Sequence, residues 1–397
     1  MQTFFDRIAW VRAQQYIAKH QSFRIVVAGT YGRTLVSHMA YHAMREHRHV
    51  RLGYPVQDAA DIPLSILGTT HEKAHTNMIA FLVGAKKREL YEREPDTIIA
   101  ELPLLTSGFA PKATKKILPQ MLVLHYVGSE HLDVFSTTQN TSHEYEQICL
   151  SLPGDARIAI NIDSTNAIAA AQHAHAQRIT YGRSLAADIC LTRAVRGDSA
   201  TGIFVEITVE GRRYEAFLPN LFAKEHVSSL LAAVACAYMR NINPAHALQA
   251  IKHMPLPHGA LQKVEARGAT ILTEHVECPE QMIESLKTLG SLPSSGRKIA
   301  VLGDVDSLGA QTIALHKQIG EQASQVASLI IFVGDAMRSA QRAAIVLEQK
   351  ADTHHFATAQ EAATWIAQHI QHNDMLYIAG GAIMNMERIV ERLLAKE

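Results

Sequence analysis

The chain begins with a segment whose apolar residues recur at helical spacing, and a short apolar run follows it. Residues 5–19 place apolar side chains every three or four positions, which predicts a leading helix. Residues 24–28 form an apolar run that ends at Gly29, and residues 35–44 return to helical spacing. The pattern therefore predicts a strand, a glycine loop and a helix in succession.

Further apolar runs alternate with helical patterns along the chain. These runs are the predicted strands, and they lie at residues 97–101, 121–127, 157–161, 298–304, 328–334 and 375–379. Strands separated by helices are typical of a mostly parallel sheet that is covered on both faces. The sequence therefore predicts an α/β fold with a P-loop-type, mostly parallel central sheet domain and a smaller, Rossmann-like C-terminal domain.

Two local features divide the chain into domains. Residues 203–209 and 213–217 flank a Glu-Gly pair, which predicts an antiparallel hairpin ahead of a helix at residues 227–239. Residues 254–259, Met-Pro-Leu-Pro-His-Gly, combine two prolines and a glycine and are typical of a linker. We expect a leading helix at residues 1–20, a central domain at 21–255 and a C-terminal domain at 256–397.

Charge and hydropathy argue against two kinds of binding partner, nucleic acids and membranes. The 38 basic and 38 acidic side chains give a formal net charge of 0, so the chain lacks the basic surplus typical of a nucleic-acid-binding protein. No apolar stretch approaches the ~20 residues of a membrane span. The four cysteines lie far apart and follow no metal-binding spacing, and the first residues do not resemble a secretory signal. We expect a cytoplasmic protein that binds neither nucleic acid nor membrane.

The glycine loop is the main candidate for chemistry. It comprises Gly29, Thr30, Tyr31, Gly32, Arg33 and Thr34, between a predicted strand and a predicted helix. Backbone N–H groups in that context bind phosphate, and a hydroxyl at the position of Thr34 is suited to Mg²⁺. The spacing departs from the general phosphate-binding pattern, and Arg33 stands where that pattern has lysine. From the residues alone, a phosphate loop and a plain strand-to-helix turn both remain open.

The order of several motifs resembles the Mur ligase family. The loop at residues 29–34 is similar to that family's Gly-Thr-Asn-Gly-Lys-Thr loop. Similar segments follow in the family's order at residues 62–67, 98–101, 127–135, 301–309, 315–320 and 386–390. The last three look most like the branch that adds D-alanyl-D-alanine to the peptidoglycan precursor. The resemblance spans roughly residues 10–395.

The resemblance implies an ATP-dependent and Mg²⁺-dependent ligase that joins a small-molecule carboxylate to an amine through an acyl phosphate. It implies that the loop residues 29–34 hold the ATP phosphates. Arg33, Glu101 and His131 become the implied catalytic residues, and Thr34, Glu101 and His131 the implied metal ligands. From the residues alone, Glu101 is equally well explained as a solvated strand end. His131 is also explained as part of a helix first turn capped by Ser129.

Departures from the family support a second hypothesis. Tyr145 stands where the family has a carbamylated lysine, and Glu225 and His226 stand where it has an adenine-contacting His-Asn pair. Residues 273–279 keep only the proline of another family motif, and the glycine loop begins too early to follow the family's UDP-binding N-terminal domain. The alternative is therefore a catalytically degenerate relative that acts as a nucleotide-binding or partner-binding subunit.

A pair of aspartates follows one predicted strand of the C-terminal domain. Asp304 and Asp306 come directly after the run at residues 298–303. They are open to interpretation as ligands or as caps of the next helix, and we expect them to cap that helix.

Overall fold

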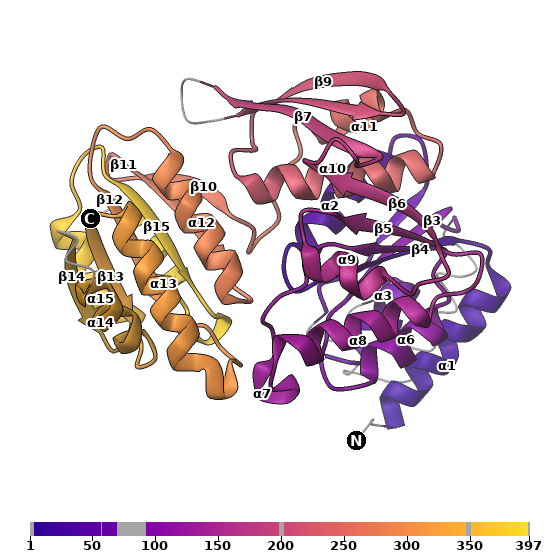
Figure 1. Cartoon of the computed structure of the whole chain (residues 1–397), viewed down its shortest axis with the longest axis horizontal. Helices are drawn as coiled ribbons and strands as arrows, with labels where there is room; N and C mark the ends of the chain where they lie inside the picture. Colours follow the sequence, from indigo (N-terminus) through magenta and orange to yellow (C-terminus); the bar gives the residue numbers. More distant parts are fainter. Residues whose placement is uncertain (1–3, 57, 70–92, 198–201, 347–350, 396–397) are drawn as a thin grey trace. The chain divides into compact units, whose positions relative to one another are not determined.

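The computed structural model describes residues 4–56, 58–69, 93–197, 202–346 and 351–395. Its contacts divide the chain into two compact units, both drawn in Figure 1. The first unit holds most residues up to Pro255. The second holds residues from Leu256 onward, together with Gly128–Thr141 and Ala223–Glu225.

The described part of the first unit contains a nine-stranded sheet in the order β2-β3-β1-β4-β5-β6-β7-β8-β9. Neighbouring strands are parallel from β2 to β7 and antiparallel from β7 to β9. The strands are β1 (Phe23–Ala28), β2 (Val50–Leu52), β3 (Thr97–Leu102), β4 (Met121–Leu124), β5 (Arg157–Asn161), β6 (Gln177–Gly182), β7 (Ile189–Arg196), β8 (Ile203–Val209) and β9 (Arg212–Leu218).

Helices connect the strands of this sheet, and α2 illustrates how an apolar stripe packs such a helix against the strands. Its apolar residues Leu35, Val36 and Met39 are buried, and the helix contacts β1 and β3. Such spacing places one stripe of the helix against the sheet. The helices are α1 (Phe4–Lys19), α2 (Arg33–Met44), α3 (Asp61–Leu67), α6 (Phe109–Ile117), α8 (Thr138–Leu150), α9 (Thr165–Ala171), α10 (Lys224–Met239) and α11 (Pro244–Ile251).

The described part of the second unit contains a six-stranded sheet in the order β10-β11-β15-β12-β13-β14. All neighbouring strands are parallel except β10 and β11. Its strands are β10 (Gln262–Ala266), β11 (Ala269–His275), β12 (Lys298–Gly303), β13 (Leu329–Val333), β14 (Asp352–Phe356) and β15 (Met375–Gly380).

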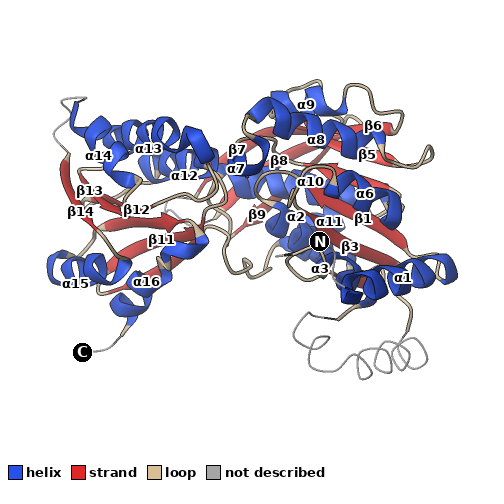
Figure 2. Ribbon diagram, turned by 90° about the horizontal axis from the view of Figure 1, so that it is seen from below, coloured by secondary structure: helices blue, strands red, loops and turns tan. Residues whose placement is uncertain are grey.

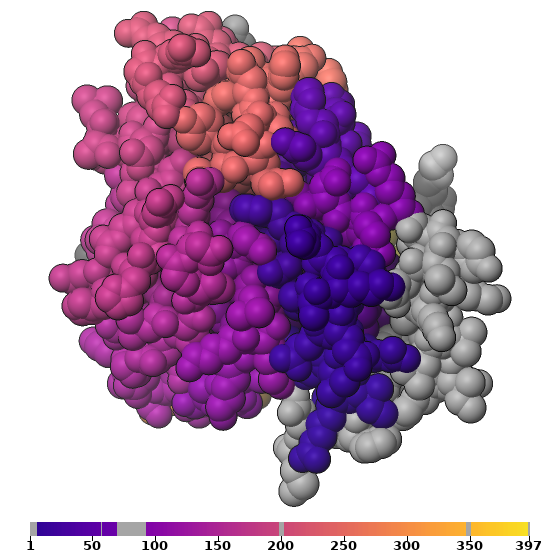
Figure 3. All heavy atoms as spheres, turned by 90° about the vertical axis from the view of Figure 1, so that its right-hand side faces the viewer, coloured from indigo at the N-terminus to yellow at the C-terminus, as the bar shows by residue number. Residues whose placement is uncertain are grey.

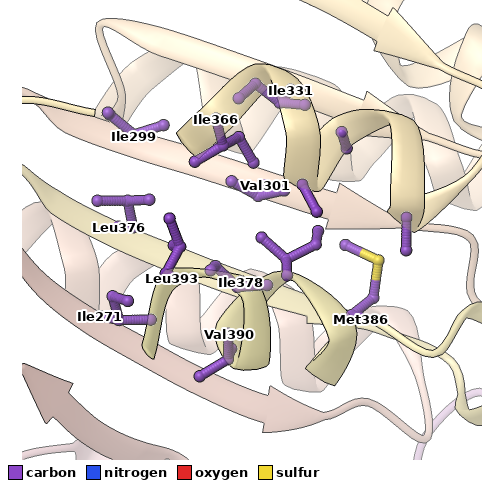
Figure 4. Packing of buried hydrophobic residues seen from close by; sticks show 14 of the residues in the cluster. Ile271, Ile299, Val301, Ile331, Ile366, Leu376, Ile378, Met386, Val390 and Leu393 are labelled. Carbon is purple, nitrogen blue, oxygen red and sulfur yellow. The ribbon is translucent and has the colours of Figure 1, made fainter. Parts of the chain in front are cut away.

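Helices cover both faces of the second sheet. Figure 2 shows α12, α13 and α14 on one face and α15 and α16 on the other. In the layer beneath α15 and α16, Val301 and Ile378 of the central strands are buried in one cluster with Ile366 and Leu393 (Figure 4). The helices are α7 (Leu132–Phe135), α12 (Pro279–Ser291), α13 (Thr312–Val326), α14 (Met337–Val346), α15 (Ala359–His369) and α16 (Glu387–Leu394), with short 3-10 turns at Gly309–Gln311 and Ala382–Met384.

The predicted α/β architecture with parallel-rich sheets is confirmed. The predicted hairpin is also present, as β8 and β9, but it extends the edge of the large sheet through β7. The run predicted as a strand to residue 127 ends earlier, because β4 stops at Leu124. Beyond it the carbonyl of Tyr126 accepts a hydrogen bond from the N–H of Thr30 at 2.6 Å, so this segment follows the glycine loop.

The prediction that Asp304 caps the next helix is wrong. Its carboxylate oxygens accept hydrogen bonds from the backbone N–H groups of Ala336 and Met337, at 3.1 and 2.8 Å. These groups lie at the start of α14, after β13, and β13 pairs directly with β12. An aspartate at the end of one parallel strand therefore caps the helix that follows the neighbouring strand.

Among the described helices, none combines the length and the apolar composition that crossing a bilayer requires.

Candidate functional site

The glycine loop connects β1 to α2, and its two glycines are needed for its shape. Gly29 has a φ of 148°, and a Cβ atom there would lie 2.9 Å from the backbone oxygen of Tyr126. Gly32 has a φ of 79° and directly precedes α2. Only glycine adopts such angles without strain, so both positions depend on it.

The N-terminus of α2 is suited to an anion. Gly32 has no side chain with which to cap the helix, and the first turn contains no acidic residue. The first backbone N–H groups of a helix have no partner within the helix, and its dipole favours negative charge there. The loop and helix therefore offer the local geometry that binds phosphate oxygens.

Arg33 folds back over the loop. Its guanidinium is buried and donates hydrogen bonds to the carbonyl oxygens of Gly29 and, at 2.9 Å, Thr30. A lysine ammonium is a compact charge on a flexible stem, whereas the planar guanidinium binds several acceptors at once. In this position Arg33 holds the loop together, and its predicted contact with phosphates stays a prediction.

Tyr31 packs against a residue that the sequence analysis did not single out. Its buried ring stacks on the ring of Tyr126, with centroids 4.6 Å apart and planes 5° from parallel. The hydroxyl of Tyr126 lies 3.0 Å from that of Ser228 on α10. Tyr126 follows β4, and no sequence motif marks it, because its role comes from the pairing of β4 with β1.

Thr34 and Glu101 are brought together. The Thr34 hydroxyl donates a hydrogen bond of 3.1 Å to the Glu101 carboxylate, which is 6% exposed. The parallel pairing of β1 and β3 places Glu101 opposite Val27, just before the loop. A hydroxyl and a carboxylate are hard oxygen ligands of the kind that Mg²⁺ prefers.

These two oxygen ligands suit Mg²⁺. They are too few to coordinate a metal ion that takes all of its ligands from the protein. Among the residues that the structure describes, no group of three or more His, Cys, Asp or Glu side chains could hold an ion. Mg²⁺ usually keeps several waters and binds through one or two carboxylates plus substrate phosphates. A site of this kind takes its remaining ligands from substrate phosphates and water.

His131 belongs to the second unit and differs from its sequence interpretation. It has a φ of 47° and immediately precedes the short helix α7, so it occupies the N-cap position instead of the first turn. Ser129 does not cap this helix, because its hydroxyl lies 3.3 Å from that of Thr138. The metal-binding role of His131 stays a prediction.

Tyr145 and its neighbours stand where the resemblance relates the chain to a carbamylated lysine, and each of them contacts other parts of the protein. Tyr145 is fully buried. Glu144 accepts hydrogen bonds from the hydroxyl of Ser107 at 2.8 Å and the N–H of Gly108 at 3.0 Å. Its carboxylate therefore holds the segment that follows β3. Glu146 lies within ion-pair distance of two histidine side chains on the surface.

A buried polar network lies beside the loop. His125 follows β4 directly, and its Nδ1 atom lies 2.8 Å from the hydroxyl of Tyr181. Complete burial lowers the pKa of His125 to about 3, so the imidazole is neutral at physiological pH. His125 therefore acts as a neutral hydrogen-bonding group here.

Two buried carboxyl groups, those of Glu225 and Glu274, lie in segments where the chain departs from the family's motifs. Glu274 accepts hydrogen bonds from the hydroxyl of Tyr377 at 2.5 Å and the amide of Gln281 at 3.0 Å. Burial raises the pKa of Glu274 to about 7. Burial and the neighbouring Glu274 carboxyl also raise the pKa of Glu225. The raised pKa values favour the protonated form of these two carboxyl groups at a higher pH than is usual for glutamate.

The chain is therefore an α/β protein with a glycine-loop sheet domain and a second, smaller domain built on a mostly parallel sheet. Residues 27–237 match the family model of the Mur ligase middle domain, and residues 261–382 match that of the Mur ligase glutamate ligase domain. The chain belongs to the Mur ligase family.

Individual relatives agree with this assignment. The chain is 22% identical over 314 residues to a UDP-N-acetylmuramoyl-tripeptide–D-alanyl-D-alanine ligase of Bacillus subtilis, covering 76% of this chain and 67% of that enzyme. Its fold is similar to that of the MurF ligase of Thermotoga maritima in complex with ADP, with a TM-score of 0.81, 16% identity, and coverage of 98% and 83%. MurF of Acinetobacter baumannii gives a TM-score of 0.80, 16% identity, and coverage of 99% and 80%.

Proposed function

We propose that this protein is an ATP- and Mg²⁺-dependent ligase that joins a small-molecule carboxylate to an amine. The contact between Thr34 and Glu101 carries the proposal, because it assembles a hydroxyl and a carboxylate beside a helix N-terminus. Two solved MurF ligases share the fold, and one of them was solved with ADP. A part in peptidoglycan synthesis belongs to the same proposal.

The chemistry follows from the weak electrophilicity of a carboxylate. One carboxylate oxygen attacks the γ-phosphorus of ATP, and the bond from this phosphorus to the β,γ-bridging oxygen breaks. ADP departs, and the product of this step is an acyl phosphate. The amine nitrogen then attacks the acyl carbon, loses a proton, and inorganic phosphate departs. Backbone N–H groups at residues 32–34 would bind the phosphates, and Thr34 and Glu101 would hold Mg²⁺, which offsets the negative charge of the transferred phosphoryl group.

Release of ADP that depends on an amine tests this proposal. The protein is incubated with ATP, Mg²⁺, and pairs drawn from a panel of organic acids and amino acids. We expect at least one pair to release ADP, and Thr34→Ala and Glu101→Ala to lower the rate about a hundredfold.

Ser37→Ala is the matched control, because its hydroxyl lies one turn further along α2. That hydroxyl is buried and has no hydrogen-bond partner among the described residues. The rate of this variant should stay within about twofold of the original. Absence of ADP release in every pairing contradicts the ligase proposal.

The position of Arg33 favours a second candidate, a nucleotide-binding or partner-binding subunit without catalysis. Its guanidinium is engaged by the loop carbonyls of Gly29 and Thr30. Titration calorimetry with ATP and Mg²⁺ separates the candidates: binding without turnover supports a nucleotide-binding subunit. If neither ATP binding nor turnover is observed, a partner-binding subunit is the remaining candidate. Co-purification with a second protein would test it.

A further inference from the structure

A cavity of about 500 Å³ lies in the first unit, lined by helix α1, the segment before α3, and helix α6 with the loop before it. Helix α1, indigo in Figure 3, lies on the surface of this unit. A volume of this size is typical of small-molecule sites. The lining includes Asp6, Trp10, Leu105, Phe109, Lys112 and Lys116.

Two lysines contribute positive charge to this cavity. Lys112 and Lys116 lie one helical turn apart on α6, a spacing that places them on one face. Among the described residues, neither ammonium has a carboxylate within ion-pair distance. Burial and the neighbouring Lys112 lower the pKa of Lys116. Like charges at this spacing repel each other, so a bound anion would relieve the repulsion.

Lys116 is also tied to an aromatic side chain. Its ammonium lies 4.7 Å from the ring centroid of Trp10, which is 2% exposed. An ammonium over an indole face is held in place electrostatically. Trp10 therefore restricts the position of Lys116 at the wall of the cavity.

Acidic side chains in the lining limit the negative charge that a ligand of this cavity can carry. Asp6 and Asp58 also line the cavity, and one carboxylate oxygen of Asp58 accepts a hydrogen bond of 2.7 Å from the N–H of Ala60. Two carboxylates at the same cavity would repel a ligand that carries several negative charges. A single anionic group that sits at the lysines avoids this repulsion.

The apolar wall is held in place from outside the cavity. Leu105 and Phe109 are half-buried, and Ser107 and Gly108 between them donate hydrogen bonds to Glu144. A loop anchored at two points keeps its shape when a ligand enters, which lowers the entropic cost of binding.

We infer that this cavity binds a small organic acid with one carboxylate and an apolar body. The carboxylate lies at Lys112 and Lys116, and the apolar body lies against Leu105 and Phe109. This site is separate from the glycine loop and does not depend on ligase activity.

Tryptophan fluorescence tests the inference directly. The chain has two tryptophans, so Trp365→Phe leaves Trp10 as the single emitter beside Lys116. Phenylacetate is the probe, and phenylacetamide is its uncharged counterpart of nearly equal shape. We expect a saturable change in emission with phenylacetate and about tenfold weaker binding of phenylacetamide, since hydrogen bonds to charged groups are stronger.

Two lysine variants and two control variants test where the carboxylate binds. Lys112→Ala and Lys116→Ala should each weaken phenylacetate binding by about tenfold. Lys115→Ala, which removes an adjacent charge of α6 that does not line the cavity, should leave it within about twofold. Thr34→Ala should leave it unchanged as well, because Thr34 does not line the cavity. Titration calorimetry on the unmodified protein repeats the measurement without the Trp365 substitution.

Several results overturn the inference. They are absence of saturable binding in both measurements, equal affinity for the acid and its amide, and binding that Lys112→Ala and Lys116→Ala leave intact. Tighter binding of inorganic phosphate or malonate than of phenylacetate would also overturn it, because the acidic lining argues for a single negative charge.

Discussion

The residues of the glycine loop depend on contacts that the sequence of the loop does not reveal. Gly29 is pressed against the backbone of Tyr126, and Arg33 donates to the carbonyl of Gly29. Thr34 is joined to a carboxylate 67 positions further along the chain. Gly29 and Thr34 therefore act through neighbours that the pairing of strands supplies, whereas Arg33 acts within the loop.

Gly29→Ala tests the close approach of the loop to Tyr126. The new Cβ would lie 2.9 Å from a backbone oxygen at a φ that alanine rarely adopts, so we expect a loss of about 1–3 kcal/mol in the free energy of unfolding. Chemical denaturation measures it. Gly154→Ala is the control, because no atom lies within 4 Å of its Cβ position. Equal stability of the two variants would contradict the packing described for the loop.

At the scale of the element, the parallel strands place polar caps on helices that are not their sequence neighbours. Asp304 follows β12 and caps α14, which follows β13. Glu144, in the interior of α8, also holds Ser107 and Gly108 just ahead of α6. In both cases a carboxylate that is distant along the chain orders the start of a helix.

Removal of the Asp304 cap should destabilise the second unit. Asp304→Ala leaves two N–H groups at the start of α14 without their acceptor, and we expect a cost of about 1–2 kcal/mol. Asp335→Ala provides the comparison, since that side chain is 93% exposed and pairs with Arg338 at the surface. Thermal unfolding of both variants measures the difference. Similar midpoints would show that the cap contributes little.

At the scale of the whole molecule, each unit has its own sheet and its own buried polar groups. The second unit buries Glu225 and Glu274 near each other, with their pKa values raised. The folded state therefore holds a proton that the unfolded chain releases at its ordinary pKa of 4.5. The stability that this proton contributes is present below that value and is lost as pH rises through about 7.

Glu225→Gln should weaken this pH dependence, because an amide stays neutral and no longer repels Glu274. We expect the midpoint of thermal unfolding of the original protein to fall by a few degrees between about pH 6 and pH 8, and that of the variant to fall less. Glu321→Gln, an exposed change on α13, serves as the control. A variant that loses stability as steeply as the original would rule out the carboxyl pair as the cause.

Local patterns predicted much of the fold. The apolar runs predicted β1, β3, β5, β12 and β15 to within one or two residues at each end, because buried parallel strands are apolar throughout. Strands β2, β6, β7, β10, β11 and β14 were missed. The exposed and half-buried residues of β6, β10 and β14 mix polar with apolar side chains. Strands β10 and β14 are the edges of their sheet, and an edge strand takes its conformation from its neighbour more than from its own composition.

Short-range periodicity predicted the alternation of strands and helices and the place of the glycine loop between β1 and α2. Motif order carried the resemblance to the Mur ligase family. The packed fold was needed to show that Thr34 meets Glu101 and that Asp304 caps α14. The physical reason is that strand order in a parallel sheet, and not distance along the chain, sets which side chains come within hydrogen-bonding reach.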